Sequence, residues 1–495
     1  MLQLNQQTLK TVYSKRKSYW SFVWCIGFVF PLVFGQNQPS KWTLEACVQY
    51  ALQNNIQIKQ TGLEKDLAEI AKKDAIGSFL PSMNAFGTHS WNIGLNQNIT
   101  TGLLENQTTQ FTSAGLNVGV DIYNGMQNQN RLQRARLQKI AAQYQLSQMQ
   151  DDIALNVANA YLQILFNKEA LKVQQSQLKT NKEQMSRAKE LWEAGQIPKG
   201  DYLDRTATVA ADEQRVIQAE NALLLSKLSL GQLLQLENYQ NFDIADEDYP
   251  MEKSPLLLEK AETIFNKAKE IRYEIKIAEN NIALAEKDVK IAKGAFQPRL
   301  TGFYAFNTRA AYFDRIVGFQ QDPNNPFTTI GVVEGTNQNV IRPNLLAITG
   351  NPLSVWEQFD INKGQSFGVQ LNIPILNGLS VRNNVARSKV LVKRSELALE
   401  QETLNLERNV FTAYSDAQGA QKAYEAAITA LEARKEAYFY ASERYQVGLL
   451  NTYDLTQAQN LLTAAESEVL RTKYDYLFRT KILALYFGLP IYERP

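Results

Sequence analysis

The chain has 495 residues, with 52 Lys and Arg against 50 Asp and Glu, a formal net charge of +2 and 44% hydrophobic residues. This balance is that of an ordinary folded protein, and it argues against a chain that works on nucleic acid. One histidine and two cysteines exclude the usual His/Cys zinc sites and a scaffold built on disulfides.

The first 35 residues have the pattern of a secretory signal peptide, 1–35. A basic cluster ends at Lys17, and an apolar run at 20–34 leads to Gly35 and a polar segment. The alternative is a membrane anchor, but about 15 apolar residues interrupted by Pro31 fall short of the roughly 20 needed to span a bilayer. No other long apolar stretch occurs, so membrane insertion would require a closed β-barrel.

The rest of the chain reads as two copies of one unit. Residues 77–81 match 294–298 at an offset of 217, whereas matches downstream hold at an offset of 253. The change of offset places an insertion, rich in Asn, Pro and Gly, in the second copy. We therefore expect these parts: a first repeat at 42–237, an acidic linker at 238–255, and a second repeat at 256–490 with its insertion at 312–365.

Each repeat is predicted to run helix, strand, loop, strand, long helix, turn and returning helix. Thr43 is a plausible N-cap for a first helix that continues to about Ile76. Residues 125–194 contain no proline, and would extend about 105 Å as one helix. Apolar residues at seven-residue spacing predict a coiled-coil seam. They are Val157, Ile164, Leu171 and Leu178, with Val410, Ala417, Tyr424 and Leu431 in the second copy.

Four segments have the period of two that is typical of half-buried strands. Two alternate strictly, 116–122 and 369–375, and two are rougher and aromatic, 82–93 and 299–307. A soluble sheet is the simpler interpretation of any one strand. Four strands per chain leave open edges, however, and three chains would supply twelve strands for a conducting barrel.

These features together resemble the TolC family of outer-membrane channel proteins. The resemblance covers the whole mature chain and depends on the duplicated unit, on the junctions 121–125 and 374–378, and on the hairpin tip 444–454. It implies an α+β membrane protein with long coiled-coil hairpins. Three chains would form a twelve-stranded barrel in outer-membrane lipid, a helical tunnel across the periplasm, and an equatorial belt.

The resemblance also implies roles for individual residues at the tips. Asp454 falls where an aspartate ring constricts the pore, and Gln457 falls where the family has a second aspartate. Tyr445 and Asp201 fall on a tyrosine–aspartate link between hairpins, and Leu450 replaces an arginine that supports the closed gate. The alternative for Asp201 and Asp454 is simple helix N-capping.

Glycines mark the ends of the long helices in both copies. Gly195 and Gly448 are expected in a left-handed conformation at the tips, where they and Val447 and Leu449 would also meet an adaptor. At the strand-to-helix junctions, Gly125 and Gly378 would permit unusual backbone angles, and Pro374 would end a strand.

The expected function is a passive exit duct, without cofactor or nucleotide site, that works with a periplasmic adaptor and an energised inner-membrane RND or ABC transporter. An enzyme is disfavoured, because His89 is alone and Asp151-Asp152 reads as a charged helix face. A secreted coiled-coil structural or adhesive protein is the alternative. Drug efflux and protein secretion are not distinguished. The insertion could cap the pore, bind a surface partner or pack on a neighbouring protomer.

Overall fold

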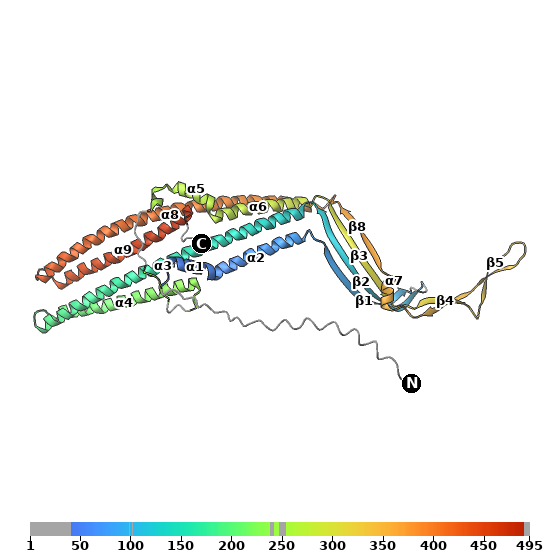
Figure 1. The fold of residues 1–495 in the computed structure, drawn as a ribbon, viewed down its shortest axis with the longest axis horizontal. Helices are drawn as coiled ribbons and strands as arrows, with labels where there is room; N and C mark the ends of the chain where they lie inside the picture. The colour runs from blue at the N-terminus through green and yellow to red at the C-terminus, as the bar shows by residue number, and fades with distance from the viewer. Residues whose placement is uncertain (1–40, 99, 101, 238–241, 247–253, 490–495) are drawn as a thin grey trace, which may run out of the picture.

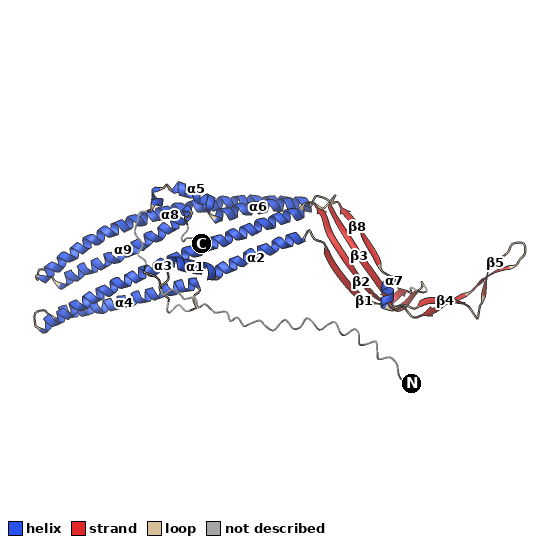
Figure 2. Ribbon diagram, in the orientation of Figure 1, coloured by secondary structure: helices blue, strands red, loops and turns tan. Residues whose placement is uncertain are grey.

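The structure is a computed structural model that describes residues 41–98, 100, 102–237, 242–246 and 254–489. Long helical hairpins form one end of an elongated chain, a four-stranded sheet forms the other, and a narrow ribbon projects beyond the sheet (Figures 1 and 2). The predicted signal peptide at 1–35 lies outside the described residues, as do parts of the predicted linker, 238–241 and 247–253.

The first repeat contributes four helices: α1 (Leu44–Asn54), α2 (Ile56–Gly77), α3 (Gln127–Glu193) and α4 (Lys199–Leu234). Thr43 caps α1 as predicted, because its side chain accepts a hydrogen bond from the Ala46 amide. The prediction of one continuous first helix was wrong. Asn55 interrupts it with ψ near 130°, caps α2 with its side-chain oxygen, and donates to the Leu233 carbonyl at 3.0 Å. Asparagine competes well for such local bonds, so the chain bends there.

The second repeat contains the same helices at constant offsets. They are α5 (Ala261–Ile271), α6 (Tyr273–Gly294), α8 (Ser380–Gln446) and α9 (Thr452–Phe487), preceded by a short 3-10 turn, η1 (Pro255–Leu258). The pairs α1/α5 and α2/α6 begin 217 residues apart, and the pairs α3/α8 and α4/α9 begin 253 residues apart. α3 and α8 each have 67 residues, which corresponds to about 100 Å of helix.

One antiparallel sheet joins the repeats in the order β1 (Ser82–Gln97), β2 (Leu104–Asn124), β3 (Arg299–Ala311) and β8 (Gly364–Asn372). β1 and β2 are longer than predicted. The prediction that Ile373 and Ile375 belong to the last strand was wrong, because β8 ends at Asn372. Pro374 follows at once, and its missing N–H cannot continue the ladder.

The register separates the sheet into an apolar and a polar face. Large side chains on the apolar face remain exposed: Met83, Trp91, Ile93, Phe367, Val369 and Leu371. Asn84 pairs with Asn117 on the other face, where Phe86 lies over Gly115 and Phe303 lies over Gly368. A ring over a cross-strand glycine covers backbone that has no side chain of its own.

The insertion at 312–365, expected as a loop, is ordered. β4 (Arg315–Gln321) pairs with β7 (Leu345–Gly350), and β5 (Phe327–Val332) pairs with β6 (Asn339–Pro343). A capped helix follows, α7 (Val355–Ile361). The Gln358 side chain bonds both the amide and the carbonyl of Ala311, so α7 covers the edge of β3 beyond the end of β8.

Each repeat has its own apolar core beside its long helix. The first is centred on Val157 and Ile164, both fully buried, and is closed by Trp42 and Ile244, which form a parallel bridge. The second is centred on Val410 and Leu483. Burial of each such side chain contributes about 1.5–3 kcal/mol. Farther along α3, Leu171 and Leu178 are only partly buried, so the predicted seam weakens toward the tip.

Candidate gate at the hairpin tips

Both long helices end in the same glycine-dependent turn. Gly195 has φ +72° and Gly448 has φ +78°, which are left-handed conformations, as predicted. The Gln196 amide donates to the Leu191 carbonyl at 2.8 Å, and the Leu449 amide donates to Arg444 at the same distance. These bonds satisfy carbonyls that a helix end otherwise leaves free. The tips therefore reverse the chain sharply and leave Val447 and Leu449 exposed.

The returning helices begin without help from the predicted aspartates. Asn451 caps α9, because its side-chain oxygen accepts from the Asp454 amide at 2.8 Å. Pro198 occupies the equivalent position of α4 and makes no side-chain cap. The N-capping alternative for Asp201 and Asp454 was therefore wrong. Both carboxylates lie in the first turn instead, where the helix dipole favours negative charge.

Arg205 on α4 is the centre of a polar cluster that joins the two hairpins. Its side chain is only 3% exposed. The guanidinium donates to Gln184 Oε1 at 2.8 Å and to Thr456 Oγ1 at 3.1 Å, and lies 6.0 Å from the ring centroid of Tyr445. No carboxylate among the described residues forms an ion pair with it. Neutral acceptors and one aromatic ring hold a buried cation.

The same polar contacts continue along the line where α3 meets α9. Gln184 and Gln459 side chains approach to 3.5 Å, and Thr463 Oγ1 donates to Gln177 Oε1 at 2.9 Å. We call this line, with Arg205 at its tip end, the own-chain seam. It consists of hydrogen bonds that water could replace, whereas large apolar side chains pack together farther from the tips.

The predicted tip residues are only partly brought together. No hydrogen bond joins Tyr445 to Asp201 in the described chain, and the Tyr445 hydroxyl instead contacts Thr452 Oγ1 at 3.5 Å. Gln457 is exposed on α9, and Leu450 precedes the Asn451 cap. Sequence reasoning missed the Arg205 cluster. The sequence does contain a pattern that could have revealed it. Polar residues recur at seven-residue spacing near the end of the apolar seam, Gln177 with Gln184 and Thr456 with Thr463.

The strand-to-helix junctions use two consecutive left-handed residues. Gly125 with Met126, and Gly378 with Leu379, all have φ between 58° and 68°. A Cβ on Gly125 would collide with the carbonyl oxygen of Gly294, whereas a Cβ on Gly378 would meet nothing within 4 Å. The first junction therefore needs glycine for both conformation and close approach.

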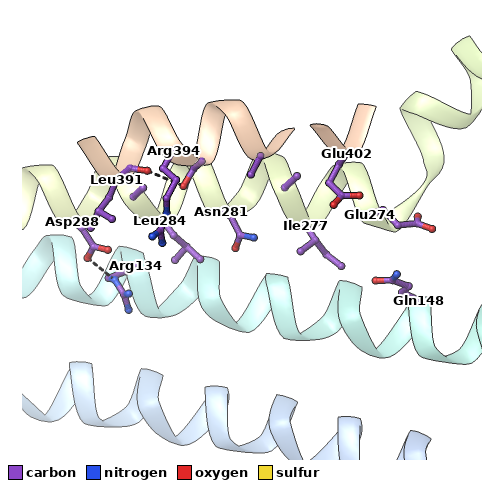
Figure 3. A pocket seen from close by; sticks show the side chains of 14 residues that line it. Arg134, Gln148, Glu274, Ile277, Asn281, Leu284, Asp288, Leu391, Arg394 and Glu402 are labelled. Carbon is purple, nitrogen blue, oxygen red and sulfur yellow. Dashed lines mark hydrogen bonds and ion pairs between the residues drawn. The ribbon is translucent and has the colours of Figure 1, made fainter. Parts of the chain in front are cut away.

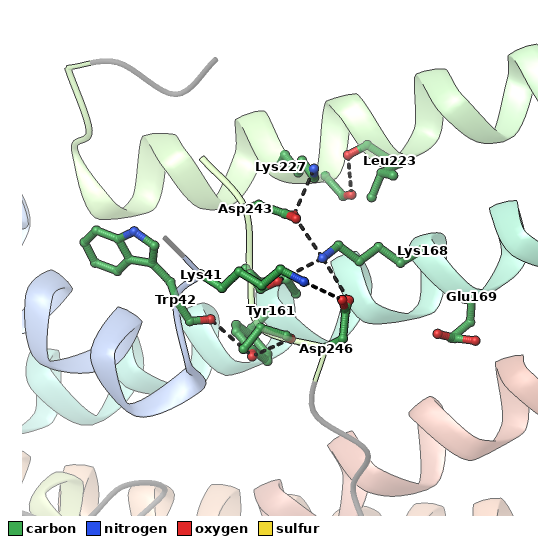
Figure 4. Close-up of polar contacts among 12 residues, drawn as sticks. Lys41, Trp42, Tyr161, Lys168, Glu169, Leu223, Lys227, Asp243 and Asp246 are labelled. Atoms are coloured by element: carbon green, nitrogen blue, oxygen red, sulfur yellow. Dashed lines mark hydrogen bonds and ion pairs between the residues drawn. The ribbon is translucent and has the colours of Figure 1, made fainter. Parts of the chain in front are cut away.

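A group of ion pairs fastens residues 242–246, part of the predicted linker, to the first hairpin (Figure 4). Lys168 Nζ contacts Asp243 at 2.9 Å, Asp246 at 3.0 Å and the Ile244 carbonyl at 2.9 Å. Lys227 also pairs with Asp243, and Lys41 with Asp246. Hydrogen bonds from Lys41 and Lys168 lower the pKa of Asp246 to about 2. Burial acts to raise the pKa of Asp243, but the hydrogen bonds from Lys168 and Lys227 outweigh it, so the pKa of Asp243 is also lowered.

A second charged group corrects an expectation about Asp151-Asp152. Asp151 is 8% exposed rather than part of a solvated face, and lies 3.8 Å from the Arg272 guanidinium. Arg272, at the break between α5 and α6, also forms two hydrogen bonds with Glu274. Burial, with the nearby Glu274 carboxylate, raises the pKa of Asp152. The group joins the break between α5 and α6 to the middle of α3.

A groove of about 650 Å³ runs along α6 between α3 and α8 (Figure 3). Both positively and negatively charged side chains line the groove, and Arg134 and Asp288 in its wall form an ion pair at 2.7 Å. It has no histidine, cysteine or serine paired with a base. The described part of the chain has no cluster of three residues suited to bind a metal, and none of its helices is long and apolar enough to span a membrane.

The paired hairpins, the sheet with one apolar face and the polar tip cluster define a class of protein, a channel-type duct of the outer membrane. Sequence features of the outer membrane efflux protein family match residues 47–235 and 264–488. The chain belongs to this family, which is one of transport ducts and places it in the outer membrane with its helices in the periplasm.

Solved structures show the same fold at low identity. The Campylobacter jejuni CmeC outer membrane channel matches with a TM-score of 0.72 and 15% identity, over 91% of this chain and 86% of that one. The Vibrio cholerae outer membrane protein VceC matches with a TM-score of 0.70 and 14% identity, over 90% and 96%. Protein CyaE of Bordetella pertussis is 29% identical over 125 residues, and the match spans about a quarter of either chain, 25% and 26%.

Proposed function

We propose that three copies of this chain form a passive exit duct from the periplasm to the outside. The observation that carries the proposal is the continuity of each chain, in which helices of 67 residues lead directly into a sheet with open edges at β1 and β8. Three such sheets would close edge to edge. Their apolar faces would then contact outer-membrane lipid, and their polar faces would line the pore.

The helical hairpins are the part of the duct that would close it. Asp454 is exposed in the first turn of α9, close to the tip. Three such carboxylates around one axis repel one another and attract cations. Gln457 would add no charge, so this constriction would depend on a single ring. The exposed tip residues Val447, Leu449 and Tyr453 supply apolar surface for a periplasmic adaptor.

An energised inner-membrane transporter, of the RND or ABC class, would supply the work through that adaptor. We infer that the chain has no catalytic activity of its own, consistent with a family of ducts. A secreted coiled-coil protein would not account for the family match in both repeats or for the fold shared with an outer membrane protein.

The test is single-channel conductance of the detergent-purified protein in a planar bilayer. We expect a small, cation-selective conductance, and we expect Asp454→Ala to lose most of that selectivity because the carboxylate ring is gone. Gln457→Ala is the matched control, one turn along the same helix and without charge. Selectivity that is unchanged in Asp454→Ala would contradict a pore ring at this position, and the absence of any conductance would contradict the duct.

A further inference from the structure

The polar face of the four-stranded sheet carries very little charge. The four strands contain only four Asp, Glu, Lys or Arg residues, and the register sets all of them on the polar face: Glu105, Asp121, Arg299 and Arg309. Arg299 and Asp121 form an ion pair at 2.8 Å, at the end of the sheet that joins the helices. The charges of this pair offset each other, so any unbalanced charge lies farther out along the strands.

Arg309 is a cation without a neighbouring anion. No carboxylate of the described chain pairs with its exposed guanidinium, which lies 5.1 Å from the ring centroid of Phe111. Ser113, opposite Arg309 in the register, is eight residues from both Glu105 and Asp121 along β2. Either carboxylate is therefore about 27 Å away along the strand. That separation is several times the Debye length of about 8 Å at physiological salt, so neither carboxylate cancels the charge.

The charged residues that follow β3 are engaged with one another. Asp314 and Arg315 are adjacent in the chain and opposite in sign. Asp360 of α7 pairs with Lys363 at 2.6 Å, and the Glu357 carboxylate is held in the capping box of the same helix. The remaining charges of the insertion lie on the ribbon, which projects away from the sheet (Figure 1). The guanidinium on β3 therefore keeps its charge unbalanced within the described part of the sheet.

The internal repeat determines how many such charges the duct would have. β1 and β3 begin 217 residues apart, so Arg309 corresponds to Asn92, an exposed neutral residue of β1. This inference rests on the proposed three-copy duct, in which the polar faces line the pore. Three Arg309 side chains would then alternate with three Asn92 side chains at one level of the barrel. The ring of Phe111 packs on each guanidinium and holds it on the polar face.

We propose that Arg309 forms a cationic ring near the outer end of the barrel, and that this ring selects for anionic cargo. The cargo would be small organic molecules that carry carboxylate, phosphate or sulfonate groups. A pore wall of low dielectric constant strengthens the field of charges of one sign and concentrates ions of the other sign. The planar guanidinium also presents its donors in a fork that matches such groups. Arg309 is thus a specificity-determining residue of the duct.

The ring is opposite in sign to the proposed Asp454 ring at the other end of the duct. The 67 residues of α8 separate the two rings by about 100 Å, so each acts on the ions at its own end. Cations enter most easily at the tips and anions at the barrel. A voltage that drives both inward fills the duct with ions, and the reverse voltage depletes it. The duct should therefore carry more current at one polarity than at the other.

The test is the block of single-channel current in planar bilayers by pyrenetetrasulfonate, an aromatic molecule with four negative charges. We expect the wild type to be blocked from one side, and Arg309→Gln to bind the probe several-fold more weakly and to lose the difference between polarities. Arg309→Lys keeps the charge and should keep most of both effects. Arg342→Gln is the matched control, because it removes an exposed arginine from the ribbon and leaves the barrel unchanged.

Moving the arginine separates the charge of the ring from its local packing. Arg309→Asn combined with Asn92→Arg transfers the guanidinium to the corresponding position of β1, and should restore both the block and the difference between polarities. Raising the salt to about 1 M shortens the Debye length to about 3 Å and should weaken the block. Asp454→Ala should remove the difference between polarities but keep the block, because its carboxylate lies at the opposite end.

Each variant is first compared with the wild type in thermal unfolding, and the exposed Arg309 should be replaceable without loss of stability. Equal block of the wild type and Arg309→Gln, in channels that conduct, would overturn the cationic ring and leave the duct intact. So would a folded double variant in which the transferred arginine restores nothing. The absence of any conductance would refute the duct itself, and the ring with it.

Discussion

Buried charge distinguishes the first hairpin from the second. Asp212 on α4 is 1% exposed, accepts from Asn181 Nδ2 at 2.5 Å, and pairs with Arg215 at 2.8 Å. Its counterpart on α9 is Ala465. Buried polar groups in coiled coils are best attested as determinants of register, at some cost in stability. In the first hairpin, this buried group therefore fixes the alignment of α3 with α4. In the second hairpin, the alignment of α8 with α9 must come from apolar packing.

Removing the Asp212 carboxylate should destabilise the protein. In Asp212→Ala, the buried Asn181 amide loses its acceptor, which costs about 1–3 kcal/mol. We expect a lower midpoint in thermal unfolding followed by circular dichroism in detergent. Ala465→Ser, at the equivalent site of the second hairpin, is the control and should stay close to the wild type. Equal midpoints for Asp212→Ala and the wild type would show that the carboxylate is not needed.

The ion pairs around Lys168 predict a loss of stability in acid. The pKa of Asp246 is lowered from 3.8 to about 2 in the folded chain, so its contribution is complete above pH about 4 and disappears as pH falls toward 2. Both Asp246 and Lys41 are about half exposed, which limits this contribution to about 1 kcal/mol. We expect Asp246→Asn to be less stable than the wild type at pH about 7, and the difference to vanish near pH about 2. A difference that is constant with pH would exclude this charge effect.

At the scale of single elements, the junction and tip glycines should tolerate alanine differently. Gly195 has φ +72° but open space around it, so Gly195→Ala should cost only the left-handed conformation, about 1–2 kcal/mol. Gly125→Ala adds a collision with the Gly294 carbonyl, and should prevent correct joining of β2 to α3. Expression and heat resistance of the two variants, compared side by side, check this. Similar behaviour would mean that the backbone at Gly125 adjusts freely.

The sequence predicted most elements because their signals are local and repeated. The absence of proline in 125–194 identified α3, and glycine identified both tips. The break at Asn55 was missed, because it depends on a bond to Leu233, far away in the sequence. Arg205 was missed for the same reason, since only packing brings its partners Gln184 and Thr456 together.

The insertion shows where sequence patterns are weakest. β4 to β7 are short, and both of their pairings contain register shifts, between Ile316 and Gly318 and between Thr329 and Gly331. Such irregular strands do not keep a clean period of two, so the segment was read as a loop.

At the scale of the whole molecule, the ribbon formed by β4 to β7 should be dispensable for folding. Arg315 and Gly350 are paired neighbours, so a short Gly-Ser link can replace 316–349 without moving β3 or α7. We expect this deletion to keep the thermal midpoint and the proposed trimer, because among the described residues the strands of the ribbon pair only with one another. Loss of the trimer would instead show that the ribbon holds copies together, and a larger conductance would show that it covers the pore.

The matching bounds of α3 with α8 and of α4 with α9 have an evolutionary consequence. A half-length ancestor could have built the same wall from six identical subunits, but all six contacts between neighbours would then have shared one sequence. After duplication and fusion, the contacts within a chain and the contacts between chains no longer had to share one sequence. In the proposed three-copy duct, an arginine at position 205 appears in three places rather than six, and its counterpart in the second repeat, Ala458, stays alanine. Covalent linkage of the two halves thus allowed selection to adjust the contacts within a chain separately from those between chains.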